Sequence, residues 1–171
     1  FTKERVGLAW LELSAGRFVT TDLDPQYLAD ELARLQPAEC VVPEGTATDP
    51  ARGRLVAREH MLLSERPAWA FSHVECRRRL LEHFGTATLE GFDLDADSPG
   101  IAAAGALLEY VQETQKSALG HIVRLEPYRR GTTLVMDEAT RRSLELTQTL
   151  RDGGREGSLL GVIDDTVTPM G

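Results

Sequence analysis

The chain has 171 residues, and 42% of them are hydrophobic, which fits one medium-sized domain, or one domain with part of a second, around a buried core. The formal net charge of −8 argues against a domain that mainly binds nucleic acid, because neutralising phosphates requires a basic surface. The two cysteines, Cys40 and Cys76, form no C-x-x-C pair, so two free thiols are expected. No apolar run reaches the roughly 18 residues that a membrane span needs, and the chain begins without Met, so we expect a non-membrane piece of a longer protein.

The beginning of the chain predicts a strand pair followed by a helix. The run over 6–13 is almost continuously apolar, as in a strand that is covered on both faces, and 18–21 returns with β-branched residues after a short turn. Asp24 and Pro25 are typical of a helix start, and Pro37 ends that helix.

The next segment predicts a short buried strand over 38–42 and then a mobile surface connection over 43–54, which is rich in Gly, Pro, Thr and Asp. A second short strand is predicted at 68–71. Ser72 and Glu75 have the spacing of a capping box and open a helix. The apolar side of this helix is expected to carry Val74, Leu80, Leu81 and Phe84.

One predicted helix ends and another begins in the centre of the chain. Gly85 stands where a left-handed helix cap is needed. A turn-rich linker over 89–97 follows, and Ser98 and Pro99 open the next helix. The small residues at 102–105 allow this helix to approach a sheet or another helix closely, so we expect a central packing helix.

The last part of the chain predicts short strands and then helices. Two β-like runs are predicted within 121–135, and Asp137 then serves as the N-cap of a strong helix over 136–150. Another apolar segment begins at Ser158. The order of elements predicts an α/β fold class, followed by the opening of a helical region.

One enzymatic alternative follows from this order. The sequence contains no P-loop, no G-x-G-x-x-G after the first strand and no H-E-x-x-H pair. The β-β-α-β opening nevertheless resembles the ribonuclease-H-like layout, on which nucleases gather carboxylates around two metal ions. Solvated acidic turns are the simpler interpretation of these carboxylates, and a metal-dependent nuclease is the alternative function. Its candidate ligands are Glu12, Asp22, Asp93, Asp95 and Asp97.

Five motifs, in order, carry a family resemblance. They are "GLAWLELSAGRF", "FGTATLEGFDL", "AAAGALLEYVQETQKSALGHI", "MDEATRRSLELTQTLRDG" and "SLLGVIDDTVTPMG". The sequence resembles the middle of the MutS family of mismatch-recognition ATPases over essentially the whole chain. Glu12, Asp93, Ser143 and Thr149 depart from the residues that are usual in the family's motifs.

The resemblance implies a division into two parts. Residues 1–127 would form the connector domain, a ribonuclease-H-like fold in which helices flank a mixed sheet. Residues 128–171 would form the truncated beginning of the core, or lever, domain. The partners of the helix over 136–150 would then lie later in the longer protein, so its leucines are expected to be partly exposed or covered by a second copy.

The resemblance also implies a function. The chain would be a non-catalytic connector that relays between mismatched DNA and the ATPase and offers a docking surface for MutL. It would hold no catalytic residue, cofactor or metal itself, and ATP and Mg would bind elsewhere in the longer protein. The implied partners are MutL, the remaining domains, a second subunit and mismatched double-stranded DNA, in the cytoplasm at the nucleoid.

Two helix faces are expected to contact partners, because they are polar and the first is rich in Arg, which is favoured at interfaces. They carry Arg77, Arg78, Arg79 and Glu82 on the first helix, and Glu109, Gln112, Glu113 and Lys116 on the second. Contacts between domains are expected in the last part of the chain, from Arg141, Arg142, Leu144, Glu145, Leu146 and Leu150. For all of these residues an ordinary solvated helix face is the alternative interpretation.

Overall fold

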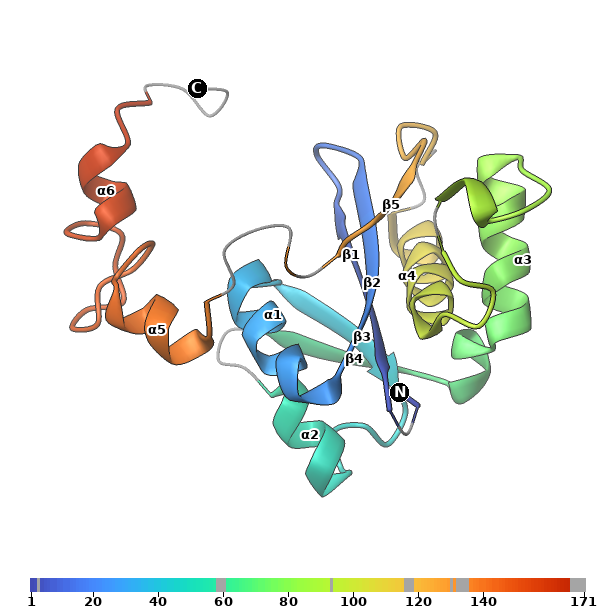
Figure 1. Ribbon diagram of the computed structural model, residues 1–171, viewed down its shortest axis with the longest axis horizontal. Helices are drawn as coiled ribbons and strands as arrows, with labels where there is room; N and C mark the ends of the chain where they lie inside the picture. Colours follow the sequence, from blue (N-terminus) through green and yellow to red (C-terminus); the bar gives the residue numbers. More distant parts are fainter. Residues whose placement is uncertain are drawn as a thin grey trace. The chain divides into compact units, whose positions relative to one another are not determined.

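The computed structural model describes residues 1–2, 4–57, 61–92, 94–115, 119–129, 131 and 136–166 (Figure 1). The chain divides into two compact units, an N-terminal unit over Phe1–Arg130 and a C-terminal unit over Gly131–Gly171. Each unit is described by itself below. Within the described ranges, every helix is too short or too polar to cross a membrane.

A three-stranded sheet, in the order β1-β2-β5, lies in the N-terminal unit. Strands β1 (Val6–Glu12) and β2 (Arg17–Leu23) form the predicted antiparallel hairpin, and β5 (Leu125–Pro127) runs parallel to β2. The first of the two β-like runs predicted near the end of this unit is therefore confirmed. The second run, over 132–135, lies outside the described residues.

A second sheet consists of two parallel strands, β3 (Glu39–Pro43) and β4 (Leu62–Arg66). The strand predicted over 38–42 is confirmed, but the strand predicted at 68–71 is wrong. Residues Ala68–Phe71 form the 3-10 helix η2, directly after Pro67, which has no backbone N–H to give to a strand ladder. The strand lies just before this proline, where it pairs with β3.

Two short helices lie between β2 and β4 in the chain, one before β3 and one after it. The predicted first helix is confirmed as the 3-10 turn η1 (Pro25–Tyr27) followed by α1 (Leu28–Leu35). The surface connection predicted over 43–54 is wrong in its second half, because residues Pro50–Val56 form α2. The Asp49 side chain caps this helix by accepting hydrogen bonds from the backbone N–H groups of Ala51 and Arg52, both at 2.9 Å.

Two longer helices follow, α3 (His73–Phe84) and α4 (Pro99–Gln115), with the 3-10 turn η3 (Glu90–Phe92) between them. Gly85 has a φ of 61°, so the predicted left-handed cap is confirmed. The capping box predicted at Ser72 is wrong, because its side chain makes no capping hydrogen bond. Val74 is also misassigned to the apolar side, because it is 73% exposed.

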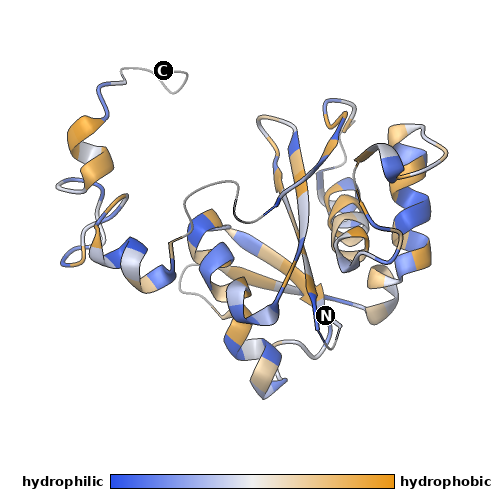
Figure 2. Ribbon diagram, in the orientation of Figure 1, coloured by the Kyte–Doolittle hydropathy of each residue, from blue (hydrophilic) through white to orange (hydrophobic). Residues whose placement is uncertain are grey.

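Helix α4 is the central packing helix that the small residues predict. It packs against β1, β2 and α3, and Figure 2 shows hydrophobic residues concentrated on α4 and on the strands. A Cβ added at Gly105 would lie only 2.3 Å from the Cβ of Cys76, so α3 and α4 approach each other more closely there than an alanine would permit. The buried residues form two clusters, one around Phe18, Leu80, Ile101, Leu108 and Leu125, and one around Val6, Leu28, Leu32, Val42 and Val56.

The described part of the C-terminal unit contains two short helices, α5 (Glu138–Ser143) and α6 (Leu159–Ile163). Asp137 caps α5 as predicted, since its carboxylate accepts the Thr140 N–H at 2.6 Å. The helix predicted over 136–150 is nevertheless too long, because Glu145 has a φ of 46°. The Glu145 carbonyl accepts the Leu159 N–H at 2.9 Å, a contact that joins the end of the α5 segment to the start of α6.

Candidate interaction surface

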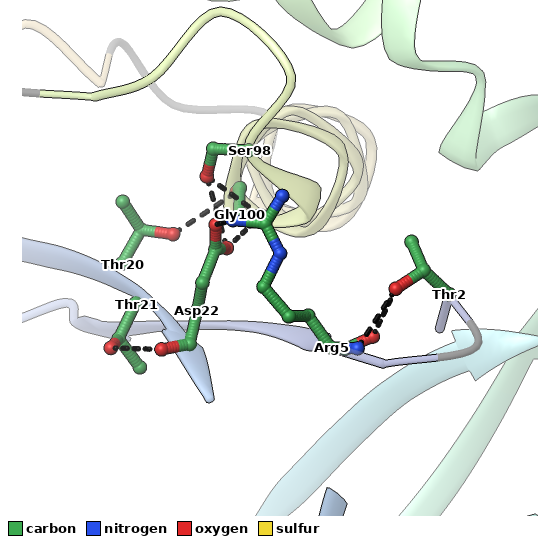
Figure 3. Close-up of polar contacts among 7 residues, drawn as sticks. All are labelled: Thr2, Arg5, Thr20, Thr21, Asp22, Ser98 and Gly100. Atoms are coloured by element: carbon green, nitrogen blue, oxygen red, sulfur yellow. Dashed lines mark hydrogen bonds and ion pairs between the residues drawn. The ribbon is translucent and has the colours of Figure 1, made fainter. Parts of the chain in front are cut away.

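The N-terminus of α4 is tied to β2 by a cluster of polar groups (Figure 3). The Asp22 carboxylate accepts a hydrogen bond from the Gly100 N–H at 2.7 Å and one from the Ser98 hydroxyl at 2.9 Å. It also pairs with the Arg5 guanidinium at 3.4 Å. The Thr20 hydroxyl donates to the Gly100 carbonyl at 3.0 Å. Asp22 therefore acts as a long-range helix cap that sets the position of α4 on the sheet.

The carboxylates considered for a nuclease do not come together. Glu12 pairs with Arg17 at one end of the β1–β2 hairpin, and Asp22 lies opposite Gly7 near the other end. Five strand positions, from Gly7 to Glu12, correspond to about 17 Å. Asp95 and Asp97 are exposed in a turn, and Asp93 lies outside the described residues. Among the described residues, no three His, Cys, Asp or Glu side chains are placed to hold one metal ion, so the nuclease alternative has no support.

The outward side of α3 carries an ordered array of charges. The Arg78 guanidinium donates to Glu82 at 2.6 Å and to Glu75 at 2.9 Å, one helical turn to either side. These hydrogen bonds, first to Glu75 and then to Glu82, raise the pKa of Arg78. The exposed Val74 stands one turn before Arg78, and the half-buried Arg77 lies beside them. We call this set the α3 outer face: Val74, Glu75, Arg77, Arg78 and Glu82.

Arg79 belongs to the helix–helix interface instead. Its guanidinium pairs with Glu109 of α4 at 3.0 Å and donates to the Gly105 carbonyl at 3.2 Å. The side chains of Arg79 and Glu109 are only 16% and 14% exposed, so they offer little surface to a partner. The structure thus places these two predicted contact residues between α3 and α4.

The outward side of α4 is polar near its end. Gln112 and Glu113 are exposed, and Glu113 pairs with Arg66 at the end of β4 at 2.5 Å. The Arg66 guanidinium also lies 5.9 Å from the centre of the Tyr110 ring. Lys116, the fourth residue predicted on this face, lies outside the described residues. Glu113 therefore joins α4 to the second sheet as well as facing solvent.

Sequence analysis missed an exposed tryptophan beside α3. Trp69 in η2 is 61% exposed, close in sequence to the exposed Val74 at the start of α3. Exposed Trp and Arg side chains are typical of protein–protein contact sites. The helical spacing of Val74, Arg77 and Arg78, at positions i, i+3 and i+4, is the signal that could have placed these three residues on one side of α3.

The residues predicted to contact other domains include exposed and half-buried apolar side chains of the C-terminal unit. Leu144 and Leu150 are 54% and 53% exposed, and Leu146 is half-buried. Val162 and Ile163 of α6 are 74% and 66% exposed. Arg141 is half-buried, Arg142 is exposed, and Glu145 accepts the Leu150 N–H at 2.5 Å. Exposed apolar side chains of this kind are typical of segments that contact other polypeptide.

Comparisons with known proteins find relatives over almost the whole chain. The family model described as MutS domain II matches residues 2–123. The DNA mismatch repair proteins MutS of Symbiobacterium thermophilum and Myxococcus xanthus are each 41% identical to the chain, over 169 and 168 residues, which is 96% of this chain and 19% of each relative. The MutS protein of Rhodopirellula baltica is 44% identical over 170 residues, which is 97% of this chain and 18% of the relative. The chain spans about a fifth of the length of the curated relatives it matches.

Proposed function

Because this chain belongs to the MutS family of DNA mismatch repair proteins, with residues 2–123 matching its domain II, we propose that it is a non-catalytic connector of a longer mismatch-repair ATPase. The connector relays between the binding of mismatched double-stranded DNA and the nucleotide state of the ATPase. ATP and Mg bind in other domains of that protein, which works in the cytoplasm at the nucleoid and with a second subunit.

The observation that carries this proposal is that side-chain contacts hold α4 to the first sheet, to α3 and to β3. Asp22 holds its N-terminus on the first sheet, and Arg79 ties it to α3 through Glu109. Near its C-terminal end, the Tyr110 hydroxyl donates to Glu39 of β3 at 2.5 Å, a hydrogen bond that raises the pKa of Tyr110. An element held at both ends and along its length moves with its surroundings as one body, which is what a mechanical relay requires.

We also propose that the N-terminal unit has the ribonuclease-H-like arrangement of a connector domain. An antiparallel hairpin, a helix and then parallel strands, in this order, support it. The strands β1 and β3 both line an apolar cavity of about 760 Å³ that also contacts α1 and α4. In a ribonuclease-H-like fold these two strands belong to one mixed sheet. A crystal structure with β1 and β3 hydrogen-bonded would support this arrangement, and one with the cavity intact would refute it.

We propose that MutL docks on the α3 outer face. The composition of this face supports the proposal. It carries the exposed Val74 and two arginines, Arg77 and Arg78, and the exposed Trp69 comes shortly before it in the chain. Arg is enriched at protein interfaces and can pair with acidic groups of a partner. Gln112 and Glu113 of α4 would extend the contact. Arg79 and Glu109 would support it from beneath by holding α3 against α4.

The test is a charge reversal of Arg77 and Arg78 in the natural full-length protein, with MutL capture as the measurement. We expect R77E/R78E to reduce capture by about tenfold, because the two new carboxylates would repel acidic groups of the partner, which slows association and weakens binding. R54E on the exposed side of α2 is the matched control and should leave capture unchanged. Equal capture of both variants, with unchanged circular dichroism, would remove this face from the proposal.

We propose, finally, that the C-terminal unit is the beginning of the core domain. Its exposed apolar side chains, among them Leu144, Leu150 and Ile163, would pack against later parts of the longer protein. Arg141, Arg142, Glu145 and Leu146 would complete this contact between domains.

A further inference from the structure

The guanidinium of Arg34 in α1 lies against two aromatic rings from distant parts of the chain. Its central carbon is 5.5 Å from the centre of the Trp10 ring in β1 and 4.9 Å from the centre of the Tyr128 ring, which follows β5. The two rings also contact each other edge-on, with centres 5.5 Å apart and planes at 74°. Three segments of the N-terminal unit therefore meet at one arginine.

Neighbouring groups fix the orientation of this arginine. The Arg34 Nε donates to the Glu31 carboxylate at 2.8 Å, and Glu31 is only 4% exposed. A buried carboxylate one helical turn earlier restricts the rotation of the guanidinium and strengthens its pairing. The Arg34 Nη2 is buried with no hydrogen-bond partner among the described residues, as expected for a guanidinium that lies against aromatic faces.

Tyr128 stands where the chain leaves the N-terminal unit. Its backbone N–H donates to the Thr20 carbonyl at 2.8 Å and extends the pairing of β5 with β2 by one residue. The compact unit ends two residues later, at Arg130. Strand β5 has only three residues, Leu125–Pro127, so few ladder hydrogen bonds hold this segment.

We infer that Arg34 is a positioning residue that holds the exit of the N-terminal unit against its body. The stack of Trp10, Arg34 and Tyr128, which we call the exit stack, supplements the short strand β5 with side-chain contacts to α1 and β1. The chain up to Tyr128 then moves with the N-terminal unit, and motion of that unit passes to the segment that follows. That Arg34 holds this exit is independent of the proposed function. A role of the exit stack in a relay rests on the proposed function.

Hydrogen exchange followed by mass spectrometry on the natural full-length protein tests the exit stack. In R34A and Y128A, we expect the peptide over 125–129 to exchange about tenfold faster, because the loss of a desolvated cation–π contact frees a short strand. Peptides from the β1–β2 hairpin should change less than about twofold, since a general loss of stability would speed both regions together.

Conservative variants distinguish the stacking of the guanidinium on the rings from a role of its positive charge alone. Y128F keeps the ring and should exchange like the unchanged protein. R34K keeps a positive charge near Glu31 but lacks the planar guanidinium, so it should behave like R34A. R52A is the matched control, because Arg52 also lies against a ring, that of Phe1 at 5.5 Å, and also pairs with an acid one turn earlier, Asp49 at 3.8 Å. It should leave the exit peptide unchanged.

The inference is overturned if R34A and Y128A leave the exit peptide unchanged, if they speed exchange equally everywhere, or if R34K behaves like the unchanged protein. A separate measurement bears on the proposed function. If R34A loosens the exit while mismatch-dependent ATP turnover stays the same, the exit stack is supported and the relay through it fails.

Discussion

At the scale of single residues, Asp22 shows how one carboxylate can suggest two different roles. In the sequence it is a candidate metal ligand on a strand, with other acidic residues elsewhere in the chain. In the structure its oxygens are occupied by Ser98, Gly100 and Arg5, so it caps α4 across a separation of 78 residues. Its function is to position a helix, because the groups around it are hydrogen-bond donors and not other carboxylates.

Removing this cap should destabilise the N-terminal unit. We expect D22A to lower the free energy of unfolding by about 1–2 kcal/mol, the cost of losing a helix N-cap. Urea denaturation followed by circular dichroism measures the change. D95A is the control, because Asp95 is exposed and offers only its backbone carbonyl, to Ser98, among the described hydrogen bonds. Equal effects of the two variants would contradict the capping role.

The two cysteine thiols should react slowly in the folded chain. Burial is the main cause that raises the pKa of Cys40 and of Cys76 to about 11. Since the thiolate is the reactive form, only about one thiol in a thousand is ionised at pH 8, and the reaction rate should rise about tenfold per pH unit up to that pKa. Ellman's reagent at pH 8 and pH 9 measures this, with the urea-unfolded chain as the fast control. Rapid reaction of two thiols in the folded chain would disprove it.

At the scale of elements, the limits of sequence analysis are visible in the helices. Asp24-Pro25 and Asp49-Pro50 are the same helix-start signature, and both open helical turns or helices in the structure. Only the first predicts a helix from the sequence, because the Gly- and Thr-rich surroundings of the second favour a loop. The helix predicted over 136–150 ends early because Glu145 adopts a left-handed conformation, which residue propensities do not reveal.

The close approach of α3 and α4 depends on Gly105. In G105A, the added Cβ would collide with the Cβ of Cys76 at 2.3 Å and with its Cα at 2.5 Å, so the helices must move apart. We expect a loss of about 1–3 kcal/mol in the free energy of unfolding, as for other overpacked cores. Thermal and urea denaturation would measure it.

G120A provides the comparison for this substitution, because a Cβ added at Gly120 would meet no atom of the described residues within 4 Å beyond its neighbours in the chain. Its stability should stay within about 0.5 kcal/mol of the unchanged chain. If G105A were equally harmless, the contact between α3 and α4 would be looser than the structure indicates.

At the scale of the whole molecule, the two units differ in how much core they bury. The N-terminal unit contains both buried hydrophobic clusters. In the C-terminal unit, Ser158 is the one buried residue among those that the structure describes. Where the described residues of a unit bury no apolar core, most of their helical stability must come from packing against other polypeptide.

Limited digestion with trypsin should reveal this difference. In the isolated 171-residue chain, we expect cleavage at Arg141, Arg142, Arg151 and Arg155 before cleavage within the N-terminal unit, because locally unfolded segments are cut first. The digest should leave a stable fragment that ends near Arg130. The natural full-length protein should protect the same sites. Equal resistance of both units in the isolated chain would show that the C-terminal unit is stable alone.

The family could be assigned from the sequence by itself, because five motifs in a fixed order do not depend on the path of the chain. Local signals also determined the β1–β2 hairpin, the start of α4 at Ser98 and Pro99, and the left-handed cap at Gly85. In each of these, a turn or cap signal between residues close together in the chain is enough to predict the element, although Asp22 also caps the start of α4 from 78 residues away.

Only the tertiary structure decided which polar residues face solvent and which join elements. Arg78 and Arg79 are neighbours in sequence, yet one is exposed and the other is held by Glu109 on a different helix. The same is true of Arg34, whose two ring partners come from β1 and from the residue after β5. Such contacts depend on where distant segments meet, which is set by the packing of α4 and the sheets and not by any local pattern of residues.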